Sequence, residues 1–179
     1  LARNYEEAWL LYDRYRNNTL GVISDVRFPM IDGGAKVADA GIQLLRRIRS
    51  CDEFLPLIMD SSESDNRQWA AEVGAGFVDK NSKKMSIDLR DRIEQHFGFG
   101  DLVFRNPTTG AEVVRIHNLK ELQDNIFTIP EDSFVYHTAN NHISRWLCSR
   151  AMFPLSEFLK RITQNEYEDV LEHRQLIFD

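Results

Sequence analysis

The stretch that decides the fold is Gly21-Val22-Ile23-Ser24-Asp25-Val26-Arg27-Phe28-Pro29. Its apolar residues predict a short strand that ends at Asp25, and Pro29 then takes the chain out into a loop, because proline has no N–H to give to a sheet. A carboxylate at the C-terminal tip of a strand is a typical place for a reactive group on an α/β sheet. The stretch therefore predicts an α/β fold with a functional site at the strand tips.

Two later predicted strands also end in polar groups. They are Leu55-Pro56-Leu57-Ile58-Met59-Asp60-Ser61-Ser62 and Gly76-Phe77-Val78-Asp79-Lys80-Asn81. Helical patterns at 41–49, 64–73 and 85–97 follow the three strands, so the region reads as successive βα units. A carboxylate, a hydroxyl and an ammonium group (Asp25, Ser61 and Lys80) are thus expected at successive strand tips.

In this order the residues resemble the receiver (CheY-like) domain of two-component response regulators, over Ala2 to Phe97. The resemblance implies a truncated flavodoxin-like parallel sheet with flanking helices. It also implies that Asp25 accepts a phosphoryl group, that Ser61 and Lys80 bind the phosphoryl oxygens, and that the switch residue Phe77 couples phosphorylation to the surface. The implied partners are a histidine kinase or phosphotransfer protein and an attached output domain.

The resemblance starts at the second helix of a receiver, so the chain is expected to be a fragment without the first strand, first helix and second strand. It implies a Mg²⁺ ion held by the Asp25 carboxylate and the backbone carbonyl of Arg27. The acidic pair that completes the ion's ligands belongs to the missing first strand, so the metal site is incomplete here. That strand would lie beside the Asp25 strand, whose free edge predicts self-association or a cover from another chain or the C-terminal region.

Several residues depart from the receiver pattern. Asn81 follows Lys80 where the family usually has proline, and Asp60 adds an acid that would weaken phosphate binding unless it points away. The loop over 30–40 is longer than usual, and either shields an acyl phosphate or is simply mobile. A plainer interpretation also exists for each site residue: Asp25 as a turn cap, Lys80 as a surface lysine, Ser62 in the place of Ser61, and Phe77 as core packing. These departures keep open an alternative, a pseudo-receiver that is not phosphorylated and serves as an interaction or dimerisation module.

Two other kinds of chemistry are disfavoured. A phosphatase of the haloacid-dehalogenase type needs a second aspartate two residues after the nucleophile, and Arg27 stands there. A metal or nucleophilic site at His137, His142 and Cys148 lacks ligand spacing, because positions five apart do not share a helical face. Capping, packing or contact with a neighbouring domain explains that cluster more simply.

A different pattern begins at Gly98, which predicts two domains, 1–97 and 98–179. The strand-like runs 99–105 and 112–116, joined by a turn-rich link, predict a β-hairpin. We further predict a helix from Asn118, with Glu121 at the capping-box position, a short strand at 134–137, a helix from 141, and an amphipathic helical tail over 154–178. Residues 97–101 and 136–147 are similar to a segment of large bacterial proteins that join a degenerate receiver to a phosphoenolpyruvate-synthase-like domain. This similarity implies a small α+β extension in a regulatory fragment that is not itself an enzyme.

The composition bounds the environment of the protein. At 42% hydrophobic residues the chain of 179 has enough apolar material for one full core and a small second one. A net charge of −6 gives no support to nucleic-acid binding, and no apolar run is long enough for a membrane span. Cys51 and Cys148 are the two cysteines, which favours a reducing compartment. We therefore expect a cytoplasmic protein without nucleic-acid or membrane partners.

Overall fold

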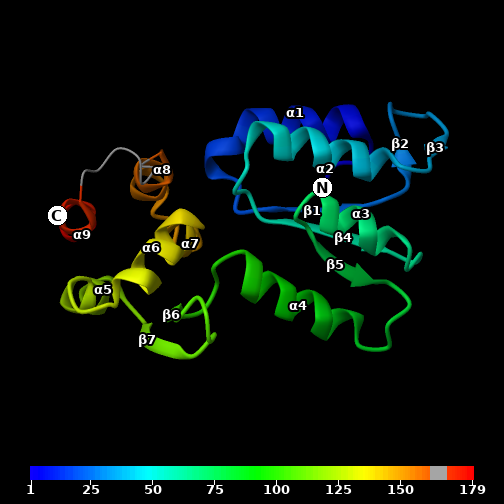
Figure 1. Ribbon diagram of the computed structural model, residues 1–179. Helices are drawn as coiled ribbons and strands as arrows, with labels where there is room; N and C mark the ends of the chain where they lie inside the picture. The colour runs from blue at the N-terminus through cyan, green and yellow to red at the C-terminus, as the bar shows by residue number, and fades with distance from the viewer. Residues whose placement is uncertain (162–168) are drawn as a thin grey trace. The chain divides into compact units, whose positions relative to one another are not determined.

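The chain folds into two units, Leu1–Phe97 and Gly98–Asp179, and each has its own buried core. The computed structural model describes residues 1–161 and 169–179 (Figure 1). None of the helices in these ranges combines the length and the apolar character that a membrane span needs.

The first unit is built on a parallel sheet of three strands, β1 (Val22–Asp25), β4 (Leu57–Ser61) and β5 (Gly76–Asp79), in the order β1-β4-β5. Asp25 is paired in register with Asp60, and Ser61 with Asp79, so the C-terminal tips of the strands meet at one edge. The predicted α/β class, with helices flanking a parallel sheet, is confirmed.

Helices cover both faces of this sheet (Figure 1). The helices are α1 (Tyr5–Tyr15), which continues into the short helix η1 (Arg16–Asn18), α2 (Ala40–Cys51), α3 (Asn66–Glu72) and α4 (Met85–His96). Side chains alternate along a strand, so Leu57 and Met59 join the larger core with α1, α2 and α3, whereas Ile58 faces the smaller core with α4. The near-continuous burial of β4 is what a central parallel strand requires.

The N-terminus of α2 lies very close to the end of β1. The N–H of Gly41 donates to the carbonyl of Val26 at 2.9 Å. A Cβ atom on Gly41 would lie 1.9 Å from the carbonyl oxygen of Asp25, far inside contact distance. A glycine at this position therefore lets the helix approach the backbone of the Asp25 segment.

The segment between β1 and α2 contains a second, small sheet. Strands β2 (Phe28–Pro29) and β3 (Lys36–Val37) pair antiparallel, with Phe28 opposite Val37. The prediction that the chain enters a loop at Pro29 is therefore wrong for Pro29 itself, which lies in β2, and the predicted loop over 30–40 contains the short strand β3. A strand of two residues is too short to leave a periodic signal in the sequence.

The outer edge of β1 has no partner strand in the described residues, since β1 pairs with β4 alone. Along this strand Val22 is half-buried, Ser24 is buried, and the Ile23 side chain is 43% exposed. The N–H of Val22 donates inward to the carbonyl of Pro56 at 2.9 Å. Because backbone groups alternate along a strand, the N–H and C=O of Ile23 point to the open edge.

The second unit combines one hairpin with helices. The hairpin strands are β6 (Leu102–Arg105) and β7 (Glu112–Ile116), which confirms the predicted pairing. The helices are α5 (Leu119–Asn125), α6 (Glu131–Ala139), α7 (His142–Cys148), α8 (Phe153–Arg161) and α9 (Val170–Phe178). Phe104, Phe134 and Trp146 are among the fully buried side chains of its core.

The short strand predicted at 134–137 is wrong, because these residues lie within α6. A strand would have buried Phe134 and Tyr136 together, whereas Phe134 and His137 are buried and Tyr136 is 41% exposed. This burial at i and i+3 is the pattern of a helix. Glu131 and Asp132 in the first turn, directly after Pro130 at the N-cap, favour a helix start through their negative charge. Of the predicted helical tail, 154–161 and 170–178 are helical, and 162–168 lie outside the described residues.

Candidate functional site

An ion pair joins the tips of β1 and β5. The ammonium Nζ of Lys80 lies 2.8 Å from Oδ2 of Asp25, and both side chains are partly exposed. The other carboxylate oxygen, Oδ1, accepts hydrogen bonds from the N–H groups of Val26 at 2.7 Å and Arg27 at 3.4 Å. The N–H of Lys80 donates to the carbonyl of Ser61 at 2.9 Å, so the lysine backbone continues the ladder between β5 and β4. Sequence reasoning placed these two residues at strand tips, and the fold brings their charges into contact.

The surroundings of Asp25 favour its ionised form. Partial burial alone would raise the pKa of the carboxyl group, but the hydrogen bond and charge of Lys80, with the N–H groups of Val26 and Arg27, outweigh it and lower the pKa. A carboxylate that remains ionised and exposed has the electronic character of a nucleophile.

Asp60 is a second carboxylate in contact with the same lysine. Its Oδ2 lies 3.7 Å from Nζ of Lys80, and its side chain is 19% exposed, against 48% for Asp25. Burial raises the pKa of Asp60, and the charge of Asp25 adds to this, while Lys80 opposes it. Its Oδ1 atom is buried without a hydrogen-bond partner in the described part of the chain. The sequence had left open whether Asp60 points away from the site, and it points toward Lys80.

Ser61 is buried, and the start of α3 holds its hydroxyl group. The oxygen Oγ accepts hydrogen bonds from Nδ2 of Asn66 at 2.9 Å and from the N–H of Glu63 at 3.1 Å. Both bonds use the oxygen as acceptor, so the hydroxyl proton takes part in neither. The fold thus places Ser61 at the tip of the strand between β1 and β5, while its hydroxyl group faces α3.

Arg27 forms a salt bridge that spans the loops after β1 and β4. Its Nη2 atom lies 2.6 Å from Oε1 of Glu63, and both side chains are half exposed or more. This salt bridge was not predicted from the sequence, because it joins two loops. Among the described residues there is no group of three or more His, Cys, Asp or Glu side chains placed to hold a metal ion. The oxygens of Asp25 and of the Arg27 carbonyl are hard donors of the kind that Mg²⁺ prefers, but they form an incomplete set of ligands.

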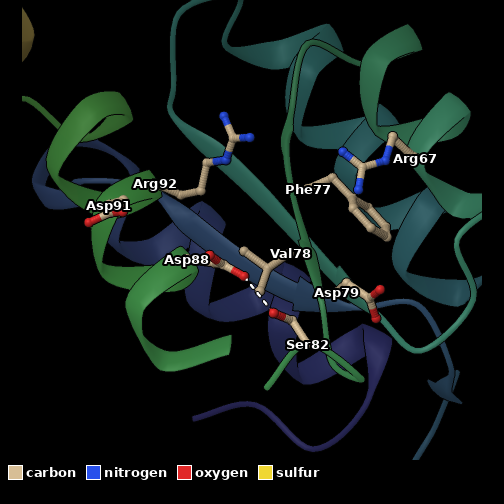
Figure 2. A pocket seen from close by; sticks show the side chains of 8 residues that line it. All are labelled: Arg67, Phe77, Val78, Asp79, Ser82, Asp88, Asp91 and Arg92. Atoms are coloured by element: carbon tan, nitrogen blue, oxygen red, sulfur yellow. Dashed lines mark hydrogen bonds between the residues drawn. The ribbon is translucent and has the colours of Figure 1, made fainter. Parts of the chain in front are cut away.

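Phe77 is buried, with 7% of its surface exposed, and packs into the larger core of the unit. The guanidinium group of Arg67 lies 4.8 Å from the centre of its ring. A polar pocket of about 450 Å³ lies between α3, β5 and α4. Figure 2 shows the Phe77 ring among the side chains that line it. The residues that line the pocket are Arg67, Phe77, Val78, Asp79, Ser82, Asp88, Asp91 and Arg92.

Asn81 links the loops after β5 and β4. Its side-chain Nδ2 donates to the carbonyl of Ser62 at 2.6 Å, and its N–H donates to Oδ1 of Asp79 at 2.8 Å. A proline at this position would lack both donors. Asn81, which departs from the receiver pattern, therefore has a structural role of its own.

The histidines of the second unit form a pair. Nδ1 of His137 in α6 and Nδ1 of His142 in α7 are 2.8 Å apart, and Nε2 of His137 accepts from the N–H of Arg105 at 2.9 Å. Burial lowers the pKa of His137 to about 4 and that of His142 to about 3. The prediction that they do not share one helical face is confirmed, since they lie on different helices.

Searches of protein-family models, of curated proteins and of solved structures found no match to this chain.

Proposed function

We propose that the first unit is a signal receiver module of a two-component phosphorelay, which accepts a phosphoryl group on Asp25 and regulates an attached domain. The observation that carries the proposal is the ion pair of Asp25 and Lys80 at the tips of parallel strands. It combines an ionised, accessible carboxylate with a cation 2.8 Å away. A phosphoryl acceptor needs both, because the transition state spreads negative charge over the transferred oxygens.

In this proposal Oδ2 or Oδ1 of Asp25 attacks the phosphorus atom in line with the bond to the leaving group. That bond breaks as an acyl phosphate forms, and the leaving group keeps its electron pair. Lys80 then pairs with a phosphoryl oxygen instead of the carboxylate, and the Ser61 hydroxyl group turns from α3 to donate a hydrogen bond to another phosphoryl oxygen. A Mg²⁺ ion would be held by Asp25 and the Arg27 carbonyl, with further ligands from outside these residues, and would neutralise charge on the phosphoryl oxygens.

The partners that fit this chemistry are a histidine kinase or a phosphotransfer protein as donor and an output domain as target. Phe77 supports such an output, because its buried ring borders the surface pocket beside Arg67. Movement at the site would reach this surface along β5. We propose a cytoplasmic protein in which this fragment is regulatory and not itself an enzyme, and in which the phosphoenolpyruvate-synthase-like part belongs to a longer chain.

The proposal is tested by phosphorylation with a small donor. Two forms of the protein are incubated with acetyl phosphate and Mg²⁺: this chain, and a form extended upstream of Leu1. The intact mass of each is then measured by mass spectrometry. We expect the extended form to gain one phosphoryl group and Asp25→Asn to gain none, since the amide has no nucleophilic carboxylate. A folded extended protein that gains no phosphoryl group contradicts the proposal.

A second candidate is a pseudo-receiver that works by binding alone. It is favoured by three features of the site: Asp60 beside Lys80, the hydroxyl of Ser61 facing α3, and Asn81 after the lysine. In this candidate the open edge of β1 is the interaction surface, and a second copy of the chain is the partner. A negative phosphorylation result together with self-association would select it.

A further inference from the structure

We propose that Asp60 is a competitor of the phosphoryl group for Lys80, and that its carboxylate holds down the affinity of the Asp25 site for phosphoryl anions. The inference rests on the proposed function of Asp25 and adds a residue that sets how readily the site is occupied. By this proposal Asp60 is a positioning residue, because it acts through Lys80 and does not touch the reacting phosphorus atom.

One lysine ammonium group contacts both carboxylates. Asp25 and Asp60 are register neighbours on β1 and β4, and one ammonium group lies 2.8 Å from the first carboxylate and 3.7 Å from the second. A lysine ammonium is a single positive charge on a flexible stem. When it turns to a phosphoryl oxygen, it must leave or weaken its contact with Asp60 as well as that with Asp25.

The phosphoryl group and the Asp60 carboxylate are both negatively charged. Phosphorylation replaces the single negative charge of the Asp25 carboxylate by about two negative charges on the phosphoryl group, beside the carboxylate of Asp60. The side chain of Asp60 is more buried than that of Asp25, so its charge is less screened by solvent. The anion therefore meets a like charge beside Lys80, and the ammonium group of Lys80 cannot contact both the anion and Asp60 as closely as it contacts either one alone.

One oxygen of the Asp60 carboxylate is poorly accommodated by the surrounding fold. Its Oδ1 atom is buried and has no hydrogen-bond partner in the described residues. A buried acceptor without a donor costs stability, so packing alone does not favour an aspartate at this position. An asparagine of nearly the same shape would remove the charge and keep the volume.

The test is the affinity for beryllofluoride, which adds to an aspartate carboxylate as a phosphoryl analogue. It is measured by titration in Mg²⁺, followed by NMR, on the chain extended upstream of Leu1, at a pH well above the usual range of aspartate. We expect Asp60→Asn to bind about tenfold more tightly than the wild type, the size of effect that about 1.4 kcal/mol of repulsion produces. Asp65→Asn, which removes an exposed charge at the start of α3, serves as the matched control and should bind as the wild type does.

Charge and shape are separated by two further variants. Asp60→Glu keeps the carboxylate and should bind as weakly as the wild type, whereas Asp60→Ala removes the charge and should bind more tightly. Thermal unfolding of each variant shows whether it is folded, and Asp60→Ala replaces Asp60→Asn if the asparagine variant does not fold.

The outcomes distinguish the two proposals. If the wild type and Asp60→Asn bind with equal affinity while Asp25→Asn does not bind, the role of Asp60 is refuted and the phosphoacceptor stands. Weaker binding by Asp60→Asn also refutes it. If neither the wild type nor Asp60→Asn binds, or if binding survives Asp25→Asn, the proposed function itself fails.

Discussion

Gly41 is the residue that sets the distance between α2 and the Asp25 segment. Its N–H bonds to Val26, and its missing side chain leaves room for the carbonyl oxygen of Asp25. The close approach fixes the backbone from which the Asp25 carboxylate projects. A site that depends on a 2.8 Å ion pair needs such a fixed support.

Gly41→Ala is expected to move the Asp25 segment and to destabilise the first unit by about 1–3 kcal/mol, the usual cost of an overpacked contact. Urea unfolding measures the loss, and NMR signals of Asp25 and Lys80 show the displacement. Gly33→Ala is the control, since Gly33 has a positive φ of 68° but open space around it. That variant should cost stability through backbone strain and leave the Asp25 and Lys80 signals in place. Unchanged signals in Gly41→Ala would contradict the prediction.

The candidate site was predictable at the level of backbone positions. Strand tips are visible in the sequence as apolar runs that end in a polar residue, so the meeting of Asp25 and Lys80 could be inferred. The direction of the Asp60 side chain and the bond from Asn66 to Ser61 could not. Both depend on how β4 twists into the loop before α3, and no periodic pattern encodes that geometry.

At the scale of secondary-structure elements, the histidine pair joins three of them: β6, α6 and α7. Nε2 of His137 accepts a hydrogen bond from the N–H of Arg105, so the ring proton of His137 must be on Nδ1. The Nδ1–H group of His137 then donates a hydrogen bond to Nδ1 of His142. Phe104 and Tyr136 pack against the His137 ring. The hydrogen-bond chain requires both imidazoles to be neutral, because a proton on either one would place two donors face to face.

The second unit is therefore expected to lose stability in acid. In the unfolded chain a histidine has a pKa of about 6.5, whereas the folded pKa values are about 4 for His137 and about 3 for His142. Between these values the unfolded state binds more protons, so the free energy of unfolding falls as the pH falls below about 6.5. Each imidazole contributes a slope of at most about 1.4 kcal/mol per pH unit. Urea titrations followed by the NMR signal of the Arg105 amide measure it.

Variants separate this effect from the titration of carboxylates. His142→Phe removes one of the two groups and should reduce the slope. His117→Gln is the control, because a hydrogen bond to Glu121 and the charge of Asp101 raise the pKa of this exposed histidine, and its small effect on stability has the opposite sign. A wild-type slope equal to that of His142→Phe would refute the prediction.

Element prediction failed where local propensity and tertiary burial disagreed. Phe134, Val135 and Tyr136 have strand propensity, yet the helix α6 forms because Phe134 and His137 are buried one turn apart. It succeeded where a specific cap exists: the Asn118 side chain accepts from the N–H of Glu121, as predicted. The Glu121 carboxylate differs from a capping box, since it accepts from the N–H of His117 instead of that of Asn118.

At the scale of the whole molecule, β1 is an edge strand whose outer side has no partner strand among the described residues. The edge presents the N–H of Ile23 beside a side chain that is 43% exposed, next to the proposed site. Unpaired edges of this kind pair readily with other strands. The three-strand sheet could be predicted from the sequence. What pairs with the edge of β1 could not, because no residue pattern identifies such a partner.

We expect the protein to self-associate through this edge. Sedimentation velocity should show a fraction of dimer that increases with protein concentration. Ile23→Lys should lower this fraction, because it places a charge at the edge where the two β1 strands would pair. Ile87→Lys, at a 57% exposed position of α4, is the control and should leave association unchanged. A compact monomer at high concentration would contradict the expectation.

The strand order of the first unit also sets the course of folding. Val22 pairs with Leu57, so the whole of α2 lies in the loop that must close before β1 and β4 meet, whereas the hairpin of the second unit closes between Arg105 and Glu112. Closing a longer loop costs more entropy before any contact repays it, and parallel pairing is slow for that reason. During refolding the hairpin of β6 and β7 can form before β4 pairs with β1. For that interval a strand destined for the centre of a sheet is itself an edge, so the yield of refolded protein should fall as its concentration rises.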